Sequence, residues 1–137
     1  MSVEVFLDTN ILLYAASGSP VEAEKRKISR QIMRSENFGI STQVLQEFFV
    51  NAVCKAHLKM TSVEARNWMS GLDERPCLIV DRELIGLSVA KSIRYKISYW
   101  DGAILAAAEA LGATTLYSED LSHGQSYGPV KVVNPFK

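Results

Sequence analysis

Short apolar, β-branched segments alternate with amphipathic helical segments along this chain, and this alternation restricts the possible folds more than any other feature. The strand-like segments cover residues 3–7, 38–41, 77–80, 114–117 and 130–133. Between them, apolar residues recur at helical spacing over residues 21–35, 42–55, 61–72, 81–93 and 98–111. Such alternation is typical of βαβ units, whose helices cover both faces of a parallel sheet. The sequence therefore predicts an α/β fold, namely a three-layer α/β/α sandwich around a central, mainly parallel sheet of four to five strands.

The length and composition are those of an ordinary globular protein. A chain of 137 residues suits one domain, which we expect to span residues 1–137. The 15 basic and 15 acidic residues cancel, so any nucleic-acid partner must be held by a local patch or through a metal. No apolar run approaches the ~20 residues that span a bilayer, and the first residues lack a secretory signal. We therefore expect a cytoplasmic protein with no membrane association, and we expect its two cysteines, Cys54 and Cys77, to be small buried hydrophobes.

Four acidic residues fall where an α/β protein gathers a shared site. Asp8 and Asp120 follow the first and fourth predicted strands, Asp101 lies in the first turn of an alanine-rich helix, and Glu47 lies in the helix after the second strand. Open α/β sheets bind their ligands outside the carboxyl ends of their strands. The four positions are therefore candidates for one acidic site.

Each of these acids also has a purely structural explanation. Asp8 is a favourable N-cap, and Asp101, three residues after a serine, suits a capping arrangement at the start of its helix. Glu47 belongs to a polar stripe that repeats every four residues, and Asp120 suits a turn. Asp81 also follows a predicted strand. Position and periodicity alone therefore do not decide which acids form a site.

A family resemblance separates the candidates. The relevant segments are residues 6–12 (FLDTNIL), 45–48 (LQEF), 99–108 (YWDGAILAAA) and 116–121 (LYSEDL). In this order and at this spacing, they resemble the four motifs of PIN-domain ribonucleases along nearly the whole chain. They are most similar to those of the VapC-type toxins of bacterial toxin–antitoxin pairs.

The resemblance implies a set of site residues. It assigns the catalytic and metal-binding positions to Asp8, Glu47, Asp101 and Asp120, with Thr9, Asn10 and Ser118 as polar supports. It leaves Asp81 as a helix cap. The fourth motif varies within the family, and Glu119 is adjacent to Asp120, so the sequence leaves open which of these two is the fourth acid.

Converging carboxylates repel one another unless they are protonated or neutralised by cations. Oxygen ligands without a histidine or cysteine cluster favour Mg²⁺, with Mn²⁺ as a substitute; His57 and His123 are isolated, and we expect both at the surface or in loops. Such ions activate a water and stabilise the charge that develops on a phosphodiester. We expect Asp8 and Asp101 to be direct ligands. Glu47 and Asp120 would act through water, position the nucleophile or hold a second ion.

The densest basic region lies in the predicted helix at residues 21–35. Arg26, Arg30 and Arg34 are four residues apart and share one face, which either is simply solvated or contacts the RNA backbone. Aromatic residues such as Trp100 are expected in the core or at a partner interface rather than as platforms for base stacking.

The leading functional hypothesis is a metal-dependent endoribonuclease that acts on RNA as the toxin of a toxin–antitoxin pair. The resemblance also implies a small cognate antitoxin and a homodimer. One alternative is a PIN-like scaffold that binds RNA or protein without cleavage. Another is a haloacid-dehalogenase-like phosphatase, but that chemistry needs a second Asp two residues after the first, where this chain has Asn10.

Overall fold

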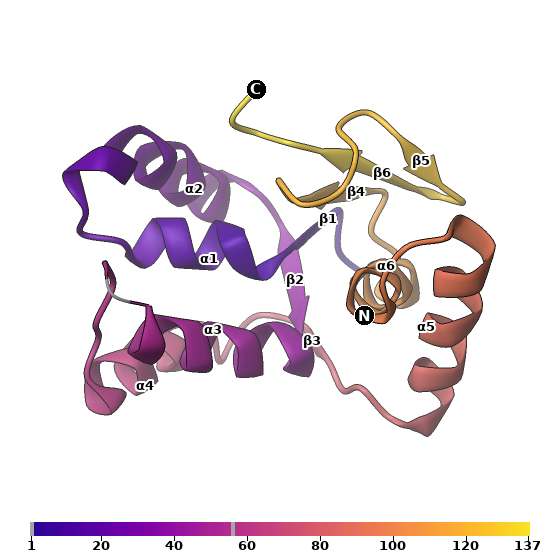
Figure 1. Cartoon of the computed structure of the whole chain (residues 1–137), viewed down its shortest axis with the longest axis horizontal. Coiled ribbons are helices and arrows are strands. Elements are labelled where there is room, and N and C mark those ends of the chain that lie inside the picture. Colours follow the sequence, from indigo (N-terminus) through magenta and orange to yellow (C-terminus); the bar gives the residue numbers. More distant parts are fainter. Residues whose placement is uncertain (1, 56) are drawn as a thin grey trace.

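The strand β1 (Val5–Leu7) lies inside a six-stranded sheet with the order β3-β2-β1-β4-β6-β5 (Figure 1). This computed structural model describes residues 2–55 and 57–137. The other strands are β2 (Phe38–Ser41), β3 (Cys77–Leu78), β4 (Thr115–Tyr117), β5 (Ser126–Tyr127) and β6 (Val130–Val133). Neighbouring strands are parallel throughout, except that β5 and β6 pair antiparallel.

The residues of β1 explain its internal position. Val5, Phe6 and Leu7 are all buried, as expected for a strand of a parallel sheet that is covered on both faces. Val5 pairs with Phe38 of β2 on one side and with Thr115 of β4 on the other. The residue that follows β1 therefore leaves the sheet between the ends of two neighbouring strands.

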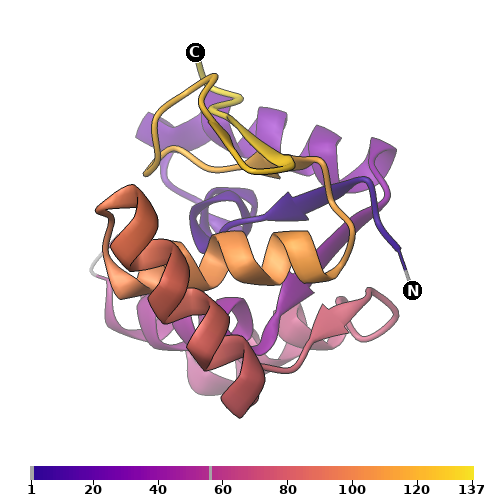
Figure 2. The same cartoon turned by 90° about the vertical axis from the view of Figure 1, so that its right-hand side faces the viewer.

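The helices form two layers, one on each side of the sheet. In Figure 1 the first four helices lie on one side and the last two on the other, and Figure 2 shows the latter pair from the front. The helices are α1 (Thr9–Ala16), α2 (Ala23–Ser35), α3 (Thr42–Cys54), α4 (Ser62–Ser70), α5 (Arg82–Tyr95) and α6 (Tyr99–Ala110). The predicted three-layer α/β/α sandwich with a mainly parallel sheet is therefore confirmed.

Side-chain caps fix where several of these helices begin. Ser41 accepts a hydrogen bond at the start of α3, Ser98 does so at the start of α6, and Thr61 and Glu64 form a reciprocal capping box on α4. The helix predicted over residues 21–35 begins differently. A short 3₁₀ turn (Pro20–Glu22) precedes α2, and Ser19, the residue before this turn, makes no side-chain cap. The caps of α3 and α6 matter most here, because both helices carry candidate acids near these ends.

Gly102 allows α5 to pack tightly against the first turn of α6. A Cβ atom at this position would lie 2.6 Å from the carbonyl oxygen of Ser88 and 3.2 Å from the backbone nitrogen of Ser92, both on α5. A larger side chain would therefore push the two helices apart. The glycine next to Asp101 thus helps to fix where that carboxylate lies.

Two details of the prediction are wrong. The sheet has six strands rather than four to five, because Ser126–Tyr127 forms a two-residue hairpin partner for β6 that is too short to leave an apolar run. Cys54 and Cys77 are exposed rather than buried. Cys54 ends α3, and Cys77 lies on the edge strand β3, where covering by neighbouring elements is incomplete.

Among the described residues, the longest apolar helical stretch still falls short of what crossing a bilayer requires.

Candidate active site

Asp8 connects the end of β1 to the first turn of α1. Its backbone nitrogen donates to the carbonyl oxygen of Tyr117 at 3.0 Å, which continues the pairing of β1 with β4. Its side chain accepts a 2.7 Å hydrogen bond from the backbone nitrogen of Thr9, so Asp8 is also the N-cap of α1. The capping explanation that the sequence offered is therefore correct, but the second carboxylate oxygen remains free for other contacts.

That second oxygen, Oδ2, faces the loop after β4. Ser118 Oγ donates to it at 2.7 Å, and both side chains are buried, with Asp8 only 4% exposed. Burial raises the pKa of Asp8 from 3.8 to about 7, since it disfavours the charged form. The hydrogen bonds from Ser118 and Thr9 lower the pKa, and the negative charges of Asp120 and Glu47 raise it. Asp8 is thus a buried carboxyl group that is poised to lose its proton near neutrality.

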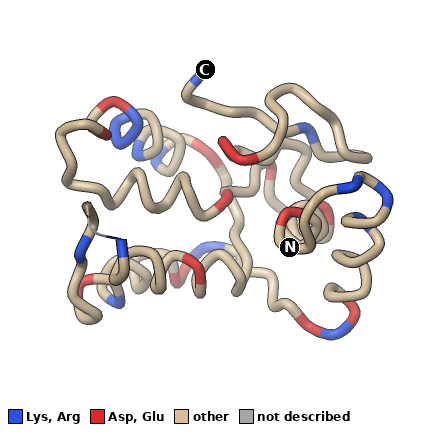
Figure 3. The backbone as a smooth tube through the Cα atoms, in the orientation of Figure 1, with Lys and Arg blue, Asp and Glu red and all other residues tan. Residues whose placement is uncertain are grey.

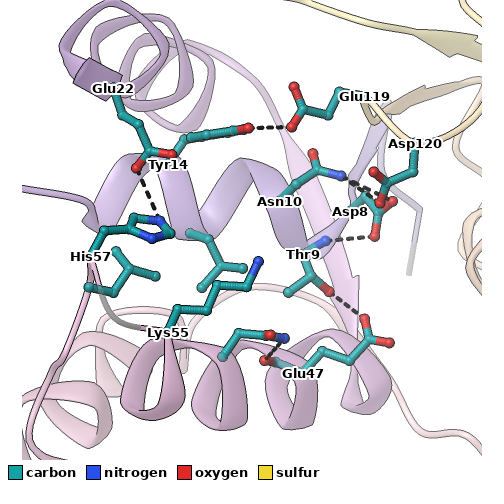
Figure 4. Close-up of a pocket in the computed structure, with 13 residues that line it drawn as sticks. Asp8, Thr9, Asn10, Tyr14, Glu22, Glu47, Lys55, His57, Glu119 and Asp120 are labelled. Carbon is teal, nitrogen blue, oxygen red and sulfur yellow. Dashed lines mark hydrogen bonds and ion pairs between the residues drawn. The ribbon is translucent and has the colours of Figure 1, made fainter. Parts of the chain in front are cut away.

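The predicted polar supports connect the acids to one another (Figure 4). Asn10 Nδ2 lies 3.1 Å from Asp120 Oδ2 and 3.5 Å from Asp8 Oδ2, so one amide donor lies between two carboxylates. On the other side, Thr9 Oγ1 donates a 2.6 Å hydrogen bond to Glu47 Oε1 on α3. Elements distant in sequence therefore bring Asp8, Glu47 and Asp120 together around the first turn of α1.

Asp101 lies at the start of α6, where its backbone nitrogen donates to Ser98 Oγ at 3.1 Å. The pKa of Asp101 is raised, chiefly by burial and then by the charges of Asp120 and Glu47, while Ser98 lowers it. Asp8 experiences the charges of the same two acids. Glu47 and Asp120 are thus the common electrostatic neighbours of Asp8 and Asp101.

Positive side chains do not neutralise this cluster. Within residues 2–55 and 57–137, no Lys, Arg or His forms an ion pair with any of the four acids. The neutral donors Ser118 and Asn10 contact Asp8 instead. Carboxylates arranged in this way are suited to binding a hard cation, which would remove their mutual repulsion.

The arrangement does not enclose an ion with protein ligands alone. In the part of the chain that the structure describes, no group of three or more carboxylate, imidazole or thiol side chains lies close enough to hold a metal ion. This suits Mg²⁺, which usually keeps several waters and binds through one or two carboxylates together with phosphate oxygens. The residues present therefore fit a hydrated divalent ion better than a fully liganded one.

Three of the four predicted acids line a cavity of about 320 Å³ between α1, α3 and the loop after β4, whereas Asp101 is not among its lining residues. Asp8, Glu47 and Asp120 lie at one end. Lys55 and His57, which follow α3, lie at the other, and His57 Nε2 is 3.5 Å from Glu22 Oε1. The sequence does not predict a site role for these two basic residues, because nothing in their spacing distinguishes them from surface side chains.

Glu119 and Asp120 are adjacent but point to different partners. Glu119 accepts hydrogen bonds from the Tyr14 hydroxyl and, at 3.0 Å, from Lys25 Nζ. Asp120 instead faces Asn10, and its backbone nitrogen donates to Ser118 Oγ at 3.1 Å. Of these two neighbouring acids, it is therefore Asp120 that shares a hydrogen-bond donor, Asn10 Nδ2, with Asp8.

The three arginines of α2 differ in their surroundings. Arg26 donates to the carbonyl oxygens of Ser17 and Ser19, at 3.0 and 3.4 Å, and Arg30 donates to that of Ala15 at 2.8 Å. Arg34 is exposed in the last turn of the helix. Figure 3 shows that Lys and Arg recur along α2. Arg26 and Arg30, however, donate hydrogen bonds to carbonyl oxygens at the end of α1 and just after it.

Asp81 has a local role. Its side chain accepts a 2.9 Å hydrogen bond from the backbone nitrogen of Leu84 and caps α5. It follows β3, the edge strand at the far end of the sheet from β6, whereas Asp8 follows an internal strand. The structure therefore distinguishes two acids that the sequence pattern could not.

Comparison with known proteins gives one family match and several similar structures. Residues 5–125 match the family described as the PIN domain. No curated protein matches the chain.

Three solved structures share the fold. A toxin–antitoxin complex from Klebsiella pneumoniae has a TM-score of 0.71 at 22% identity, with 96% of this chain and 98% of that one covered. VapC20 from Mycobacterium tuberculosis, described as a sarcin–ricin loop cleaving toxin, has a TM-score of 0.68 at 15% identity, covering 85% and 90%. FitAcB from Neisseria gonorrhoeae has a TM-score of 0.62 at 16% identity, covering 96% and 98%.

Proposed function

The chain belongs to the PIN-domain family, and from this premise we propose that it is a metal-dependent endoribonuclease that acts as the toxin of a toxin–antitoxin pair. The observation that carries this proposal is the environment of Asp8. Asp8 is 4% exposed, receives only uncharged hydrogen-bond donors, and lies beside two further carboxylates. A binding scaffold has no need of such a cluster, because uncompensated burial of charge destabilises the fold.

Asp8 is the principal candidate for holding Mg²⁺, or Mn²⁺ in its place. Asp101, Asp120 and Glu47 would complete the coordination directly or through water, as their shared electrostatic neighbourhood allows. A divalent ion in this position supplies an activated water and neutralises the charge that develops on a phosphodiester oxygen.

The supporting residues give this site its geometry. Ser118 orients Asp8 from the loop after β4, and Thr9 fixes Glu47 against the first turn of α1. Asn10 keeps an amide donor between Asp8 and Asp120 and so fixes the two carboxylates relative to each other. A phosphodiester that enters the 320 Å³ cavity meets the carboxylates at one end and the basic side chains of Lys55 and His57 at the other.

The partners follow from the same proposal. The Klebsiella pneumoniae structure is a toxin–antitoxin complex, and the Mycobacterium tuberculosis structure is described as a sarcin–ricin loop cleaving toxin. We extend these properties to this chain as an RNA substrate and a small cognate antitoxin that blocks the site, and we propose a homodimer because the family resemblance implies one.

The direct test is cleavage by the purified protein of structured and unstructured RNAs, with Mg²⁺ or Mn²⁺ and with chelator. We expect cleavage that requires the ion and disappears in Asp8→Asn. Retention of RNA without cleavage, unchanged in Asp8→Asn, would instead indicate a scaffold. Expression in cells with and without the neighbouring open reading frame tests the toxin role, which predicts growth arrest that the neighbouring product relieves.

A further inference from the structure

A second groove lies beside the acid-lined cavity, and Glu47 and Asn51 line both. Its volume is about 310 Å³, and its lining consists of Gln43, Gln46, Glu47, Val50, Asn51 and Trp100. All but Trp100 come from α3, and Trp100 lies in the first turn of α6, directly before Asp101. A strand that occupies the acid site therefore has an adjacent groove for its next group.

Trp100 gives this groove a flat, exposed aromatic surface. Its side chain is 62% exposed, although large aromatic side chains usually bury most of their area. The ring of Tyr99 meets it edge to face at a centroid distance of 5.0 Å and an interplanar angle of 80°. One face of an indole held in this way is available for a second planar group, and nucleobases stack on such surfaces.

Gln43 supplies an independent observation. This side chain is only 6% exposed, and its Nε2 donates to Glu47 Oε2 and to the carbonyl oxygen of Trp100, both at 3.3 Å. Because both partners are acceptors, the amide nitrogen must face them, which leaves Oε1 buried without a hydrogen-bond partner. A buried acceptor in this state destabilises the free protein, and a ligand donor in the groove removes this penalty when the enclosed amide of Gln43 shifts to meet it.

We infer that the groove binds an unpaired nucleobase of the RNA strand whose phosphodiester lies at the acid cluster. The indole of Trp100 stacks on the base, and the amide groups of Gln43, Gln46 and Asn51 contact its hydrogen-bonding edge. The inference rests on the proposed function and adds to it a subsite for one base beside the cleaved bond.

The composition of the groove favours a base over a protein segment. Val50 and Trp100 are its only large apolar side chains, whereas three carboxamides and a carboxylate make up the rest. A hydrophobic peptide anchor would leave Gln43 Oε1 without a donor, but a base offers donors and acceptors in one plane. The position between the acid cavity and Asp101 is also the one that a continuous RNA strand would occupy.

The test uses Trp100 as its own reporter. The chain has two tryptophans, so Trp68→Phe leaves Trp100 as the only indole, and Asp8→Asn in the same protein prevents cleavage. Trp100 emission is titrated in Mg²⁺ with a single-stranded oligoribonucleotide, its duplex, and the same strand with abasic positions. We expect quenching by the single strand and affinities about tenfold weaker for the abasic strand and the duplex. Equal binding of the abasic strand, or RNA binding that leaves Trp100 emission unchanged, overturns the inference.

Substitutions separate stacking from general binding. Trp100→Ala should weaken single-strand binding by about tenfold, and Trp100→Phe should retain most of the affinity, because a smaller aromatic ring still stacks. Ile93→Ala is the matched control, since Ile93 is 72% exposed on α5 and is not among the lining residues of the groove. An equal effect of Trp100→Ala and Ile93→Ala would contradict a base site.

Mapping of RNA ends with otherwise wild-type proteins distinguishes this inference from the proposed function. Cleavage whose site preference is identical in Trp100→Ala removes the base site and leaves the nuclease intact. Base-dependent quenching without cleavage in any metal leaves the base site and removes the nuclease. Emission that changes only with protein concentration identifies the groove as a contact between two copies of this chain, which also overturns the inference.

Discussion

Ser118 Oγ donates a 2.7 Å hydrogen bond to Asp8 Oδ2, although 110 residues of sequence separate the two. Pairing of β1 with β4 makes this contact possible, because it brings the residue after each strand to the same edge of the sheet. The bond favours the charged form of Asp8, but it is outweighed by burial. The balance between them has a measurable consequence for stability.

Asp8 should make the metal-free protein less stable as the pH rises. The pKa of Asp8 is about 7 in the folded protein and 3.8 for an ordinary carboxyl group, so between about pH 4 and pH 7 the folded state holds a proton that the unfolded state has released. The free energy of unfolding therefore falls across this window, by up to ~4 kcal/mol. Urea unfolding at about pH 5 and pH 8 in chelator measures the fall, and Asp8→Asn should abolish it. An equal fall in the variant would assign it to another group.

Asp101→Asn should raise the melting temperature of the metal-free protein. The variant removes a charge that is disfavoured first by burial and then by the charges of Asp120 and Glu47, as the raised pKa of Asp101 indicates, and it nearly keeps the side-chain shape. The lost interaction with the dipole of α6 is only ~0.3–1 kcal/mol. Melting curves with and without Mn²⁺ should show stabilisation of the wild type by the ion and much less of the variant. A lower apo melting temperature with an unchanged Mn²⁺ response would identify Asp101 as a plain cap.

Glu119 and Asp120 should differ in their effect on cleavage. Asp120→Asn changes the carboxylate that shares Asn10 with Asp8, so we expect RNA cleavage to fall ~10–100-fold. Glu119→Gln breaks the partly exposed ion pair with Lys25 and should lower stability by less than ~1 kcal/mol, with cleavage per folded molecule close to wild type. Initial rates at matched folded concentrations test both. The reverse order of effects would make Glu119 the fourth acid.

Arg30 and Arg34 should separate a structural role from an RNA contact. Arg30→Ala removes a 2.8 Å hydrogen bond to the carbonyl of Ala15 in the last turn of α1 and should cost ~0.5–1.5 kcal/mol. Arg34→Ala should leave stability within ~0.5 kcal/mol. If α2 contacts the RNA backbone, Arg34→Ala should also weaken the binding of every RNA sequence and reduce the slope of affinity against salt concentration by ~1. An unchanged salt slope would assign the face to solvent.

Asp81→Ala should lower stability without affecting chemistry. The side chain caps α5 through the backbone nitrogen of Leu84, so its loss should cost ~0.5–2 kcal/mol. Cleavage per folded molecule should remain that of the wild type. Denaturant titration followed by an activity assay at saturating Mg²⁺ makes the comparison, and a folded but inactive variant would require a different site.

The sequence was informative where a pattern depends on neighbouring residues. The strands and the helices predicted over residues 42–55, 81–93 and 98–111 follow from apolar periodicity and capping residues. The structure contains these helices as α3 (Thr42–Cys54), α5 (Arg82–Tyr95) and α6 (Tyr99–Ala110). The hairpin partner at Ser126–Tyr127 could not be predicted, because two residues carry no periodicity. Burial of Cys77 was predicted wrongly, because an apolar context does not reveal that its strand lies at the sheet edge.

The candidate site shows the same division. Strand-end position suggested Asp8 and equally Asp81; the family resemblance favoured Asp8, and the strand order gives the structural reason, because β1 is internal and β3 lies at the sheet edge. The contacts of Arg26 and Arg30 were not predictable, because their acceptors are backbone carbonyls whose location no side chain specifies. The exposure of Trp100 likewise depends on how α6 is placed against α3, which the local sequence does not encode.

The sheet order has a consequence for the order of events during synthesis. β1 is made early but needs β4, more than 100 residues later, before the loop that carries Ser118 and Asp120 can reach Asp8. Contacts of such high sequence separation form slowly, because loop closure opposes them. A growing chain that has not yet extended past β4 therefore lacks two of the groups that surround Asp8. The surroundings of Asp8 are therefore completed only after β4 and the loop that follows it have been synthesised.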